Sequence, residues 1–424
     1  MSDCSGRGYF APDTQRCECH DCYRGASCAN RSTTCVLTLL SVGQPYLLQQ
    51  FWQALPAGTA SVRIEPGYRG DYQYPSVFPP KDFPLPPPLN VGYDVWKAMP
   101  GIGPSLDAAI RGMHAAVGNV ETEGRYIIVG TGATSLFQAA TFAYSKLHKK
   151  AVPVVARSPR YDMYNQYYVV TQNPTVARWA EDTRALKDGP DVVELVTHPN
   201  NPDGHPRLGE PPLFANSSKI HDLVYYWPHL CGGACEEAHD EGALGSVRMA
   251  KADVDLAVFS LTKFTGHAGS RFGWALVKDL AVVEQMTLYL TATEIMPSID
   301  TAYRTLELLR GMLADEGGTK HALAARFFAS TRVAMKARWA RLGELFAGQT
   351  RYALRSAPLS AYAWVECRHA TGAECAAPFF ERGLLGMPGA AFGEDNEAFF
   401  RINLTLFDSD FELLVEKLAE VLRA

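Results

Sequence analysis

A lysine, two hydroxyl residues and an arginine follow one short apolar segment, and their types and spacing could do chemistry. Residues 254–260 have the apolar character of a buried strand; Ser260, Thr262 and Lys263 stand at its end, and Arg271 comes eight residues after Lys263. A lysine beside apolar strand residues can be neutral and nucleophilic, and can then form a Schiff base with an aldehyde. The alternative is an exposed lysine whose amine stays in water, the more common case for a lysine taken alone.

A glycine-rich turn comes earlier in the chain. Residues 130–135 read Gly-Thr-Gly-Ala-Thr-Ser, directly after a predicted strand at 125–129 and before a helical pattern that runs to residue 147. Backbone N–H groups at the start of a helix attract phosphate, and glycine lets the anion come close. Two glycines in a tight turn are common in α/β proteins, so the motif alone is weak evidence for a phosphate site.

Two further segments carry polar groups after predicted strands. Residues 198–204, His-Pro-Asn-Asn-Pro-Asp-Gly, follow the strand at 192–197, and by composition alone they predict a surface turn. Asp222 lies in the apolar strand predicted at 220–225, where a carboxylate is rarely buried without a cationic partner. Asp222 and Tyr225 are three residues apart, so they would face opposite sides of an extended strand and could meet only if the chain bends between them.

The elements that must position these residues predict an α/β fold. Predicted strands at 125–129, 151–155, 192–197, 220–225 and 254–260 alternate with helical patterns, which indicates a mostly parallel sheet covered on both faces. Residues 301–350 look helical throughout, and a strand at 361–366 with helices near 375–385 and 408–423 indicates a smaller α+β domain. We predict a cysteine-rich module at 1–35, a proline-rich extended arm at 36–100, a large domain at 101–300 and a small domain at 301–424.

Cysteines are concentrated at the start of the chain. Six fall within the first 35 residues, where apolar residues are too sparse for a core: Cys4, Cys17, Cys19, Cys22, Cys28 and Cys35. We expect three disulfides in a small loop-rich module, the alternative being a zinc site that uses the Cys19/Cys22 pair. Cys367 and Cys375 are close enough to clip a loop, whereas Cys231 and Cys235 could pair or stay reduced.

Composition limits the partners and the compartment. The 424 residues carry 40 Lys+Arg against 45 Asp+Glu, a net charge of −5, which argues against nucleic acid as a partner. No apolar run reaches roughly 18 residues, so we expect no membrane span, and no metal site is predicted. Disulfides imply the secretory route, a vacuole or the outside, although the Met-Ser-Asp-Cys start is no signal peptide; we interpret the signal as removed. Possible N-glycosylation triplets begin at Asn30, Asn216 and Asn403.

Taken together, the order of these motifs resembles the fold type I pyridoxal-phosphate enzymes of the aminotransferase superfamily. Nearly the whole chain further resembles the alliinases, plant carbon–sulfur lyases that carry an EGF-like module. The resemblance rests on the cysteine module, the run Tyr-Tyr-Trp-Pro-His at 225–229, the run at 265–275 and the pair Cys367/Cys375. Plant tryptophan aminotransferases are similar relatives without the cysteine module.

The resemblance implies a cofactor, pyridoxal 5′-phosphate, and a role for each matching residue. Lys263 would hold the cofactor aldehyde and move protons at the substrate Cα, and Asp222 would pair with the ring nitrogen. Asn201 and Tyr225 would bond the ring oxygen, and Tyr161 would stack on the ring. The phosphate would be held by Gly132, Ala133, Thr134, Ser260, Thr262 and Arg271, with Tyr72 reaching it from a second subunit. Arg401 would grip the substrate carboxylate, an expectation that the resemblance alone supports, since an arginine ending a strand is often a surface residue.

The expected activity is a carbon–sulfur lyase that cleaves S-alkyl-L-cysteine sulfoxides to a sulfenic acid and aminoacrylate, which decays to pyruvate and ammonia. The alternative is an aminotransferase acting on an aromatic amino acid such as tryptophan. Alliinases carry a Ser-Gly-Asp-Gly stretch near the substrate, whereas this chain reads Ser-Val-Gly-Gln-Pro at 41–45, keeping Gly43 as a substrate contact but resembling the aminotransferases otherwise. A third possibility is a secreted binding protein with an inactive fold. A homodimer is expected, because the resemblance places Tyr72 across a subunit boundary.

Overall fold

The structure is a computed structural model that describes residues 4–11, 16–19, 22–32, 37–38, 102–171, 173–181, 183–184, 186–189, 191–238 and 244–423. Most of the arm predicted at 36–100 lies outside these residues. Within them, no helix is both long and apolar enough to cross a membrane.

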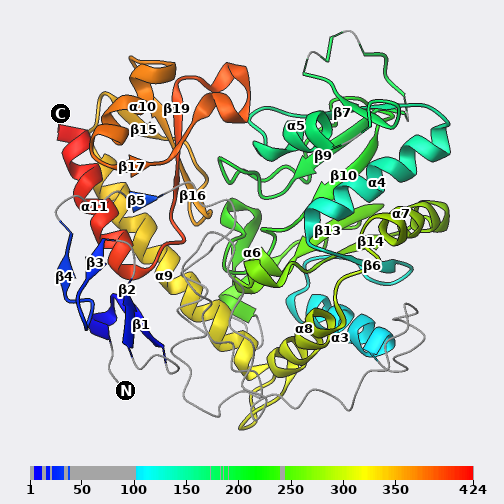
Figure 1. Ribbon diagram of the computed structural model, residues 1–424, viewed down its shortest axis with the longest axis horizontal. Coiled ribbons are helices and arrows are strands. Elements are labelled where there is room, and N and C mark those ends of the chain that lie inside the picture. The colour runs from blue at the N-terminus through cyan, green and yellow to red at the C-terminus, as the bar shows by residue number, and fades with distance from the viewer. Residues whose placement is uncertain are drawn as a thin grey trace.

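A seven-stranded, mainly parallel sheet forms the larger half of the molecule, shown at the right of Figure 1. The spatial order is β6 (Tyr126–Gly130), β14 (Gly273–Val277), β13 (Leu256–Ser260), β10 (Ser218–Asp222), β9 (Val193–Thr197), β7 (Val152–Ala156) and β8 (Ala177–Trp179). The strands from β13 to β8 are parallel, whereas β14 pairs antiparallel with both β13 and β6. The predicted α/β class with a mostly parallel sheet is confirmed.

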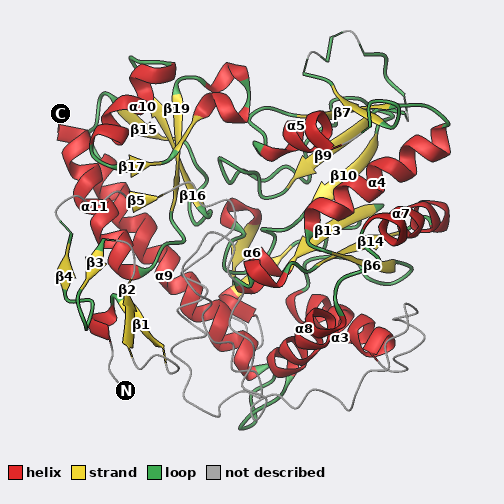
Figure 2. Ribbon diagram, viewed as in Figure 1, coloured by secondary structure: helices red, strands yellow, loops and turns green. Residues whose placement is uncertain are grey.

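Helices cover both faces of this sheet (Figure 2). On one face α4 (Ala133–His148), α5 (Met163–Gln166) and α7 (Leu280–Thr293) pack on side chains such as Val193 and Val258. On the other face α3 (Ile102–Val117), α8 (Ile299–Leu313) and the start of α9 (Ala322–Phe346) pack on the alternate residues, such as Phe259 and Trp274. Neighbouring residues of one strand thus enter different cores, which is why these strands are apolar without alternation.

A smaller antiparallel sheet lies beside the large one. Its order is β15 (Tyr352–Leu354), β16 (Tyr362–Cys367), β19 (Phe399–Asn403) and β18 (Met387–Pro388), and it packs against α9, α10 (Gly372–Glu381) and α11 (Asp408–Arg423). Helix α9 joins the two halves, because Phe327 and Phe328 enter the core of the large sheet whereas Met335 and Leu342 enter that of the small one. The division into domains stays a proposal, and this packing favours a boundary within α9.

Two predicted elements differ from the structure. The helix expected throughout 301–350 is interrupted between α8 and α9, where Gly317 and Gly318 both have positive φ. The strand expected at 220–225 ends at Asp222; the chain then turns, and Tyr226 N donates to Leu223 O over 3.0 Å. That turn is the bend that Asp222 and Tyr225 need in order to face the same space.

The cysteine-rich module contains two small hairpins, β1 (Gly8–Ala11) with β2 (Arg16–Cys19) and β3 (Tyr23–Arg24) with β4 (Asn30–Arg31). Disulfides join Cys4 to Cys17 and Cys19 to Cys28, and Cys22 is also disulfide-bonded, so the zinc alternative is wrong. The module contacts α11 through an Arg31–Glu416 ion pair of 2.8 Å. Just after it, β5 (Leu37–Thr38) pairs with β17 (Leu384–Leu385).

The other four cysteines are paired within the body of the protein. Cys367 and Cys375 form the predicted clip. Cys231 bonds to Cys235, the first residue of a hairpin made of β11 (Cys235–Glu237) and β12 (Val247–Met249). Of the possible glycosylation sites, Asn403 is only 1 % exposed, so the folded protein does not offer it to an enzyme.

Candidate functional site

The glycine-rich turn joins the end of β6 to the start of α4 and forms a cradle for an anion. Gly132 has φ 91° and precedes α4, whose start has no side-chain cap. The Arg271 guanidinium lies so close that a Cβ added to Gly132 would be 2.7 Å from Nη2. Helix-start N–H groups and a guanidinium therefore meet at a point that only glycine leaves open.

Two residues that sequence analysis missed hold this turn in place. Gly273 of β14 passes so close that a Cβ there would be 2.8 Å from the carbonyl carbon of Gly132. Glu294, just after α7, accepts hydrogen bonds from the backbone N of Thr131 (2.9 Å) and from its hydroxyl. Both contacts bridge distant parts of the chain, so no local motif indicates them.

Lys263 lies on α6 (Leu261–Thr265), a five-residue helix that directly follows β13. Ser260 caps this helix, because its hydroxyl accepts a hydrogen bond from Thr262 N over 3.2 Å. His229 Nε2 lies 3.3 Å from the carbonyl oxygen of Lys263, and burial lowers the pKa of His229 to about 3. A carbonyl can only accept, so the neutral imidazole donates to it and anchors the backbone of Lys263.

Asp222 ends β10 as a buried carboxylate in the same region. The Tyr164 hydroxyl donates to its Oδ2 over 2.6 Å, and Val224 N donates to Oδ1 over 3.2 Å. Burial raises the pKa of Asp222 to about 6, opposed by these hydrogen bonds and by the charge of Lys263. A cation placed against Asp222 would stabilise the ionised form.

A chain of hydrogen bonds links the turn after β10 to the small sheet. Tyr225 OH lies 2.8 Å from Tyr362 OH, and Asn201 Nδ2 reaches Tyr225 OH at 3.5 Å. Asn201 Oδ1 in turn accepts a hydrogen bond from Arg401 Nη1 over 2.9 Å. Lys263 Nζ lies 5.5 Å from the centre of the Tyr225 ring, so these groups share one space. Tyr362 was missed, because an aromatic residue in a buried strand predicts only core packing.

Arg401 is buried, with 1 % of its surface exposed, so the surface alternative considered for it is wrong. Its guanidinium carbon lies 4.3 Å from the centre of the Tyr362 ring and 4.7 Å from that of Phe392. Its Nη1 lies 3.9 Å from Asp162 Oδ1. Its Nε has no hydrogen-bond partner among the described residues, which leaves one donor of a buried cation available to a ligand.

Aromatic side chains line the side of the site nearest α5. The Tyr161 ring lies edge-on to Tyr164 at 5.3 Å and to Tyr167 at 6.3 Å. Thr134 Oγ1 donates to Tyr167 OH over 3.1 Å, which ties this wall to the phosphate turn. Of the predicted site residues, Gly43 and Tyr72 lie outside the described residues, and the structure brings the others to one edge of the large sheet and the facing small sheet.

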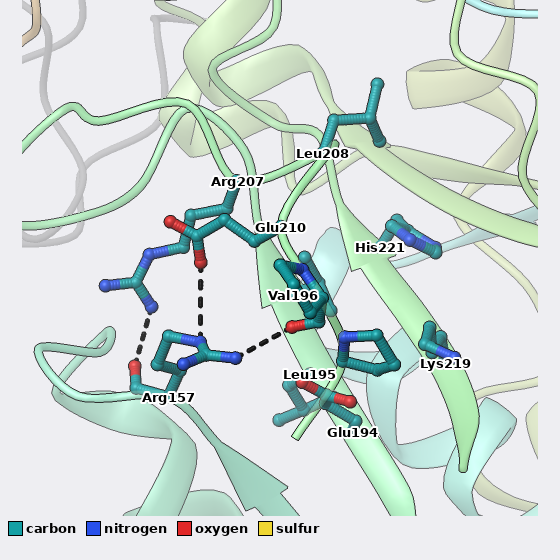
Figure 3. A pocket seen from close by; sticks show the side chains of 11 residues that line it. Arg157, Glu194, Leu195, Val196, Arg207, Leu208, Glu210, Lys219 and His221 are labelled. Carbon is teal, nitrogen blue, oxygen red and sulfur yellow. Dashed lines mark hydrogen bonds and ion pairs between the residues drawn. The ribbon is translucent and has the colours of Figure 1, made fainter. Parts of the chain in front are cut away.

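A separate hollow lies on the other side of β9 and β10 (Figure 3). It is lined by His221, whose side chain points away from that of Asp222 because successive strand residues face opposite sides. Its charged groups satisfy one another: Arg157 pairs with Glu210 at 3.4 Å, and Arg207 donates to the Arg157 carbonyl over 2.7 Å. It contains none of the predicted site residues, so it is not the candidate site.

Comparisons with known proteins bear on this geometry. A family model described as "Allinase" matches residues 96–422, about three quarters of the chain. The chain belongs to the alliinase family. "Tryptophan aminotransferase-related protein 3" of Arabidopsis thaliana is 33% identical over 444 residues, covering 98% of this chain and 86% of that protein. "Alliin lyase 1" of Allium sativum is 27% identical over 442 residues, covering 98% of this chain and 81% of its own length.

Solved structures agree on the fold. The aromatic aminotransferase from Pyrococcus horikoshii OT3 superposes with a TM-score of 0.56 at 17% identity, covering 92% of this chain and 96% of that one. An aminotransferase from Staphylococcus aureus gives 0.55 at 14% identity, with 92% and 93% covered. The fold is that of the fold type I aminotransferases, and the alliinase and aminotransferase families use pyridoxal 5′-phosphate.

The residues of this chain fit that cofactor. The cradle at Gly132 and Arg271 suits its phosphate, and the buried Ser270 hydroxyl nearby has no partner among the described residues. Lys263 is an amine of the type that bonds an aldehyde, and Asp222 is a buried carboxylate suited to a protonated ring nitrogen. The phosphate, the aldehyde and the ring nitrogen of the cofactor would therefore each have a suitable partner in this chain.

Proposed function

We propose that this chain is a pyridoxal-phosphate enzyme that removes the Cα proton of an L-amino acid. The observation that carries the proposal is the convergence of Lys263, Asp222 and the cradle at Gly132 at one edge of the large sheet, facing Arg401. When bound, the cofactor supplies an electron sink for the charge that develops at Cα.

The cofactor's phosphate would be held at the cradle and its ring across the sheet edge. The groups available to the phosphate are those of Gly132, Ala133, Thr134, Ser260, Thr262 and Arg271. Asp222 would stay ionised beside the ring nitrogen, because a positive partner offsets the burial that raises its pKa. Asn201 and Tyr225 would donate to the ring oxygen, and Tyr161 would lie along the ring.

Lys263 and Arg401 would have different roles toward the substrate. Arg401 binds the α-carboxylate through a guanidinium that the small sheet holds rigidly and whose Nε is unpartnered among the described residues. Lys263 accepts the Cα proton, and the anchoring of its carbonyl by His229 keeps the amine in reach.

Among the family's chemistries we propose transamination of an amino acid with a 2-oxo acid. Support comes from the relative at 33% identity over 98% of the chain, whose printed name refers to tryptophan aminotransferase. The similarity covers 98% of this chain and therefore includes the region of the cysteine module. The presence of that module consequently does not favour the lyase over the aminotransferase. A second support is Asp162, a buried carboxylate beside Arg401, because an ionised carboxylate would repel a sulfoxide oxygen that came against it.

Cleavage of S-alkyl-L-cysteine sulfoxides is the second candidate. It is supported by the family model and by alliin lyases that are 27% identical over 97–98% of this chain. Both reactions start with the same proton removal; they differ in whether a sulfur group leaves Cβ or the amino group passes to a 2-oxo acid.

The test measures exchange of the Cα proton first and the reaction products second. The loaded protein is incubated in D₂O with L-tryptophan or with an S-alkyl-L-cysteine sulfoxide, and deuterium at Cα is measured by NMR. We expect exchange with L-tryptophan that Lys263→Ala abolishes, and indole-3-pyruvate once a 2-oxo acid is added. Pyruvate from the sulfoxide, without tryptophan turnover, would replace transamination by the lyase. No exchange with either compound would favour the binding-protein alternative.

Assembly and location are separate proposals. We propose a homodimer in which Tyr72 reaches the site of the partner subunit, and a secretory, vacuolar or extracellular location because of the disulfides. Sedimentation of the loaded protein tests the first: a fully active monomer would contradict it.

A further inference from the structure

Asp162 is a buried carboxylate next to Tyr161 that serves no role in its own helix. It occupies the position before α5, where an aspartate normally accepts a hydrogen bond from the first turn, yet it makes no such cap. Its backbone is already helical there, with φ −58° and ψ −33°, which is not the extended conformation of a capping residue. The side chain is 4 % exposed. Capping of α5 therefore does not explain an aspartate at this position.

The carboxylate lies within the proposed substrate site. Its Oδ1 is 3.9 Å from Arg401 Nη1, beyond hydrogen-bond distance, and has no hydrogen-bond partner among the described residues. Burial raises the pKa of Asp162, whereas the positive charges of Arg401 and Lys263 oppose that rise and favour the ionised carboxylate. The charge of Asp162 in turn acts on Tyr161 and Tyr362. Asp162 thus faces the same space as the residues proposed to bind and deprotonate the substrate.

Asp162 Oδ1 and Arg401 Nε both lack a hydrogen-bond partner among the described residues, although the two side chains form a long ion pair of 3.9 Å through Arg401 Nη1. Buried charged groups of this kind are costly unless a partner satisfies them. A ligand that fits both atoms must bring a carboxylate for Arg401 Nε and a hydrogen-bond donor for Asp162 Oδ1. An acceptor placed against Asp162 would be repelled.

We infer that Asp162 is a specificity-determining residue that accepts a hydrogen bond from a donor on the substrate side chain while Arg401 binds the α-carboxylate. The inference rests on the proposed function and names its substrate class: amino acids whose side chains carry an N–H, O–H or ammonium donor. Acidic side chains and sulfoxides, which offer only acceptors at that point, are disfavoured.

Matched pairs of amino acids test the donor directly. L-Tryptophan is compared with 3-(benzothienyl)-L-alanine, in which sulfur replaces the indole N–H, and L-lysine with L-norleucine, which lacks the ammonium. For the wild-type loaded enzyme we expect kcat/KM to favour the donor-bearing member of at least one pair by about 10-fold or more, the usual effect of a hydrogen bond to a charged group. The pair that shows it identifies a neutral or a cationic donor.

Two substitutions separate specificity from structure. Asp162→Ala removes the acceptor, and the preference should fall to about 1. Asp162→Asn keeps an acceptor but loses the charge, so a preference for tryptophan should persist whereas one for lysine should fall. Asp255→Ala, an exposed aspartate outside the site, is the control and should change neither ratio.

A merely structural counter-ion for Arg401 would give a different result. Asp162→Ala would then lower kcat/KM for both members of a pair by the same factor and leave the ratio unchanged, which overturns the inference. The same holds if the wild type shows no preference in either pair. Binding of each pair to loaded Lys263→Ala by calorimetry reads the preference without turnover: a donor preference that Asp162→Ala removes supports the inference even if the proposed reaction fails, and equal binding or no binding overturns it.

Discussion

The two walls of the site are built in different ways. On the cofactor wall, Lys263, Asp222 and the Gly132 turn each follow directly from the end of a strand in the large sheet, so main-chain geometry positions them. On the substrate wall, Arg401, Tyr362 and Asp162 come from separate strands and a loop. The Arg401 guanidinium contacts both of the others, the Tyr362 ring at 4.3 Å and Asp162 Oδ1 at 3.9 Å.

This difference predicts that substitutions change the two walls to different extents. The strand ends of a parallel sheet form a crevice that does not depend on the sequences of the surrounding loops. The cofactor wall can therefore stay the same in proteins that catalyse different reactions. The substrate wall is adjustable, because single substitutions there alter which donors and acceptors face the substrate. We therefore expect the reaction and its substrate to be decided on the side that Asp162 and Tyr362 occupy.

The largest effect is expected when the amine of the cofactor wall is removed. Lys263→Ala should lower turnover of every amino acid by more than about 10³-fold, since both the covalent attachment and the proton transfer are lost. The absorbance expected at about 420 nm for a lysine-bound cofactor should disappear as well. Lys278→Ala, which changes an exposed lysine at the opposite end of β13 and β14, should keep both. Retained turnover in Lys263→Ala would mean that another base acts.

Asp222→Asn should have the next largest effect, with activity reduced by about 10²–10³-fold, because a neutral amide no longer stabilises a positive ring nitrogen. Steady-state kinetics with saturating cofactor measures it. If activity is unchanged, Asp222 does not contact the ring.

The same substitution should act in the opposite direction on the stability of the cofactor-free protein. Burial raises the pKa of Asp222 from 3.8 to about 6. Between these pH values the folded state retains a proton that the unfolded state has lost, so the free energy of unfolding of the wild type falls as pH rises from about 4 to 6. Asparagine does not ionise, so the free energy of unfolding of Asp222→Asn should not fall in this way. The variant should be about 2–3 kcal/mol more stable than wild type at pH 7, with no difference near pH 4. Urea unfolding at the two pH values measures it, and an equal difference at both would contradict the buried charge.

Much of the cofactor wall, and little of the substrate wall, could be predicted from sequence. The Gly132 turn, Asp222 and Lys263 stand after apolar runs, and the α/β class follows from the same runs. Arg401 was predicted only by resemblance, and Tyr362, Asp162 and Glu294 were missed, because their partners lie far away in sequence: Tyr362 meets Tyr225 over a separation of 137 residues. The break between α8 and α9 was missed because the helical pattern continues on both sides of it.

On the substrate wall, Arg401→Lys should raise KM and lower kcat/KM by about 10–100-fold, because an ammonium cannot reproduce the planar fork that binds a carboxylate. The spectrum of the loaded protein should stay unchanged, since the cofactor wall is intact. Loss of the cofactor band in this variant would show that the two walls are not separate.

The smallest effect is expected for Tyr362→Phe, which removes only the hydroxyl that pairs with Tyr225. We expect a reduction of kcat by about 3–10-fold, the value of one hydrogen bond, and a shift in the pH profile. Tyr126→Phe, an exposed tyrosine at the far end of β6, is the control and should behave as wild type. A pH profile identical to wild type in Tyr362→Phe would limit this hydroxyl to packing.

The most direct test of the account is chemical. The loaded protein is reduced with borohydride, digested, and its peptides are mapped by mass spectrometry. The account predicts one added pyridoxyl-phosphate group, on Lys263, in the peptide that follows β13. A label on another lysine, or an unlabelled Lys263 in a protein that has bound the cofactor, would contradict it.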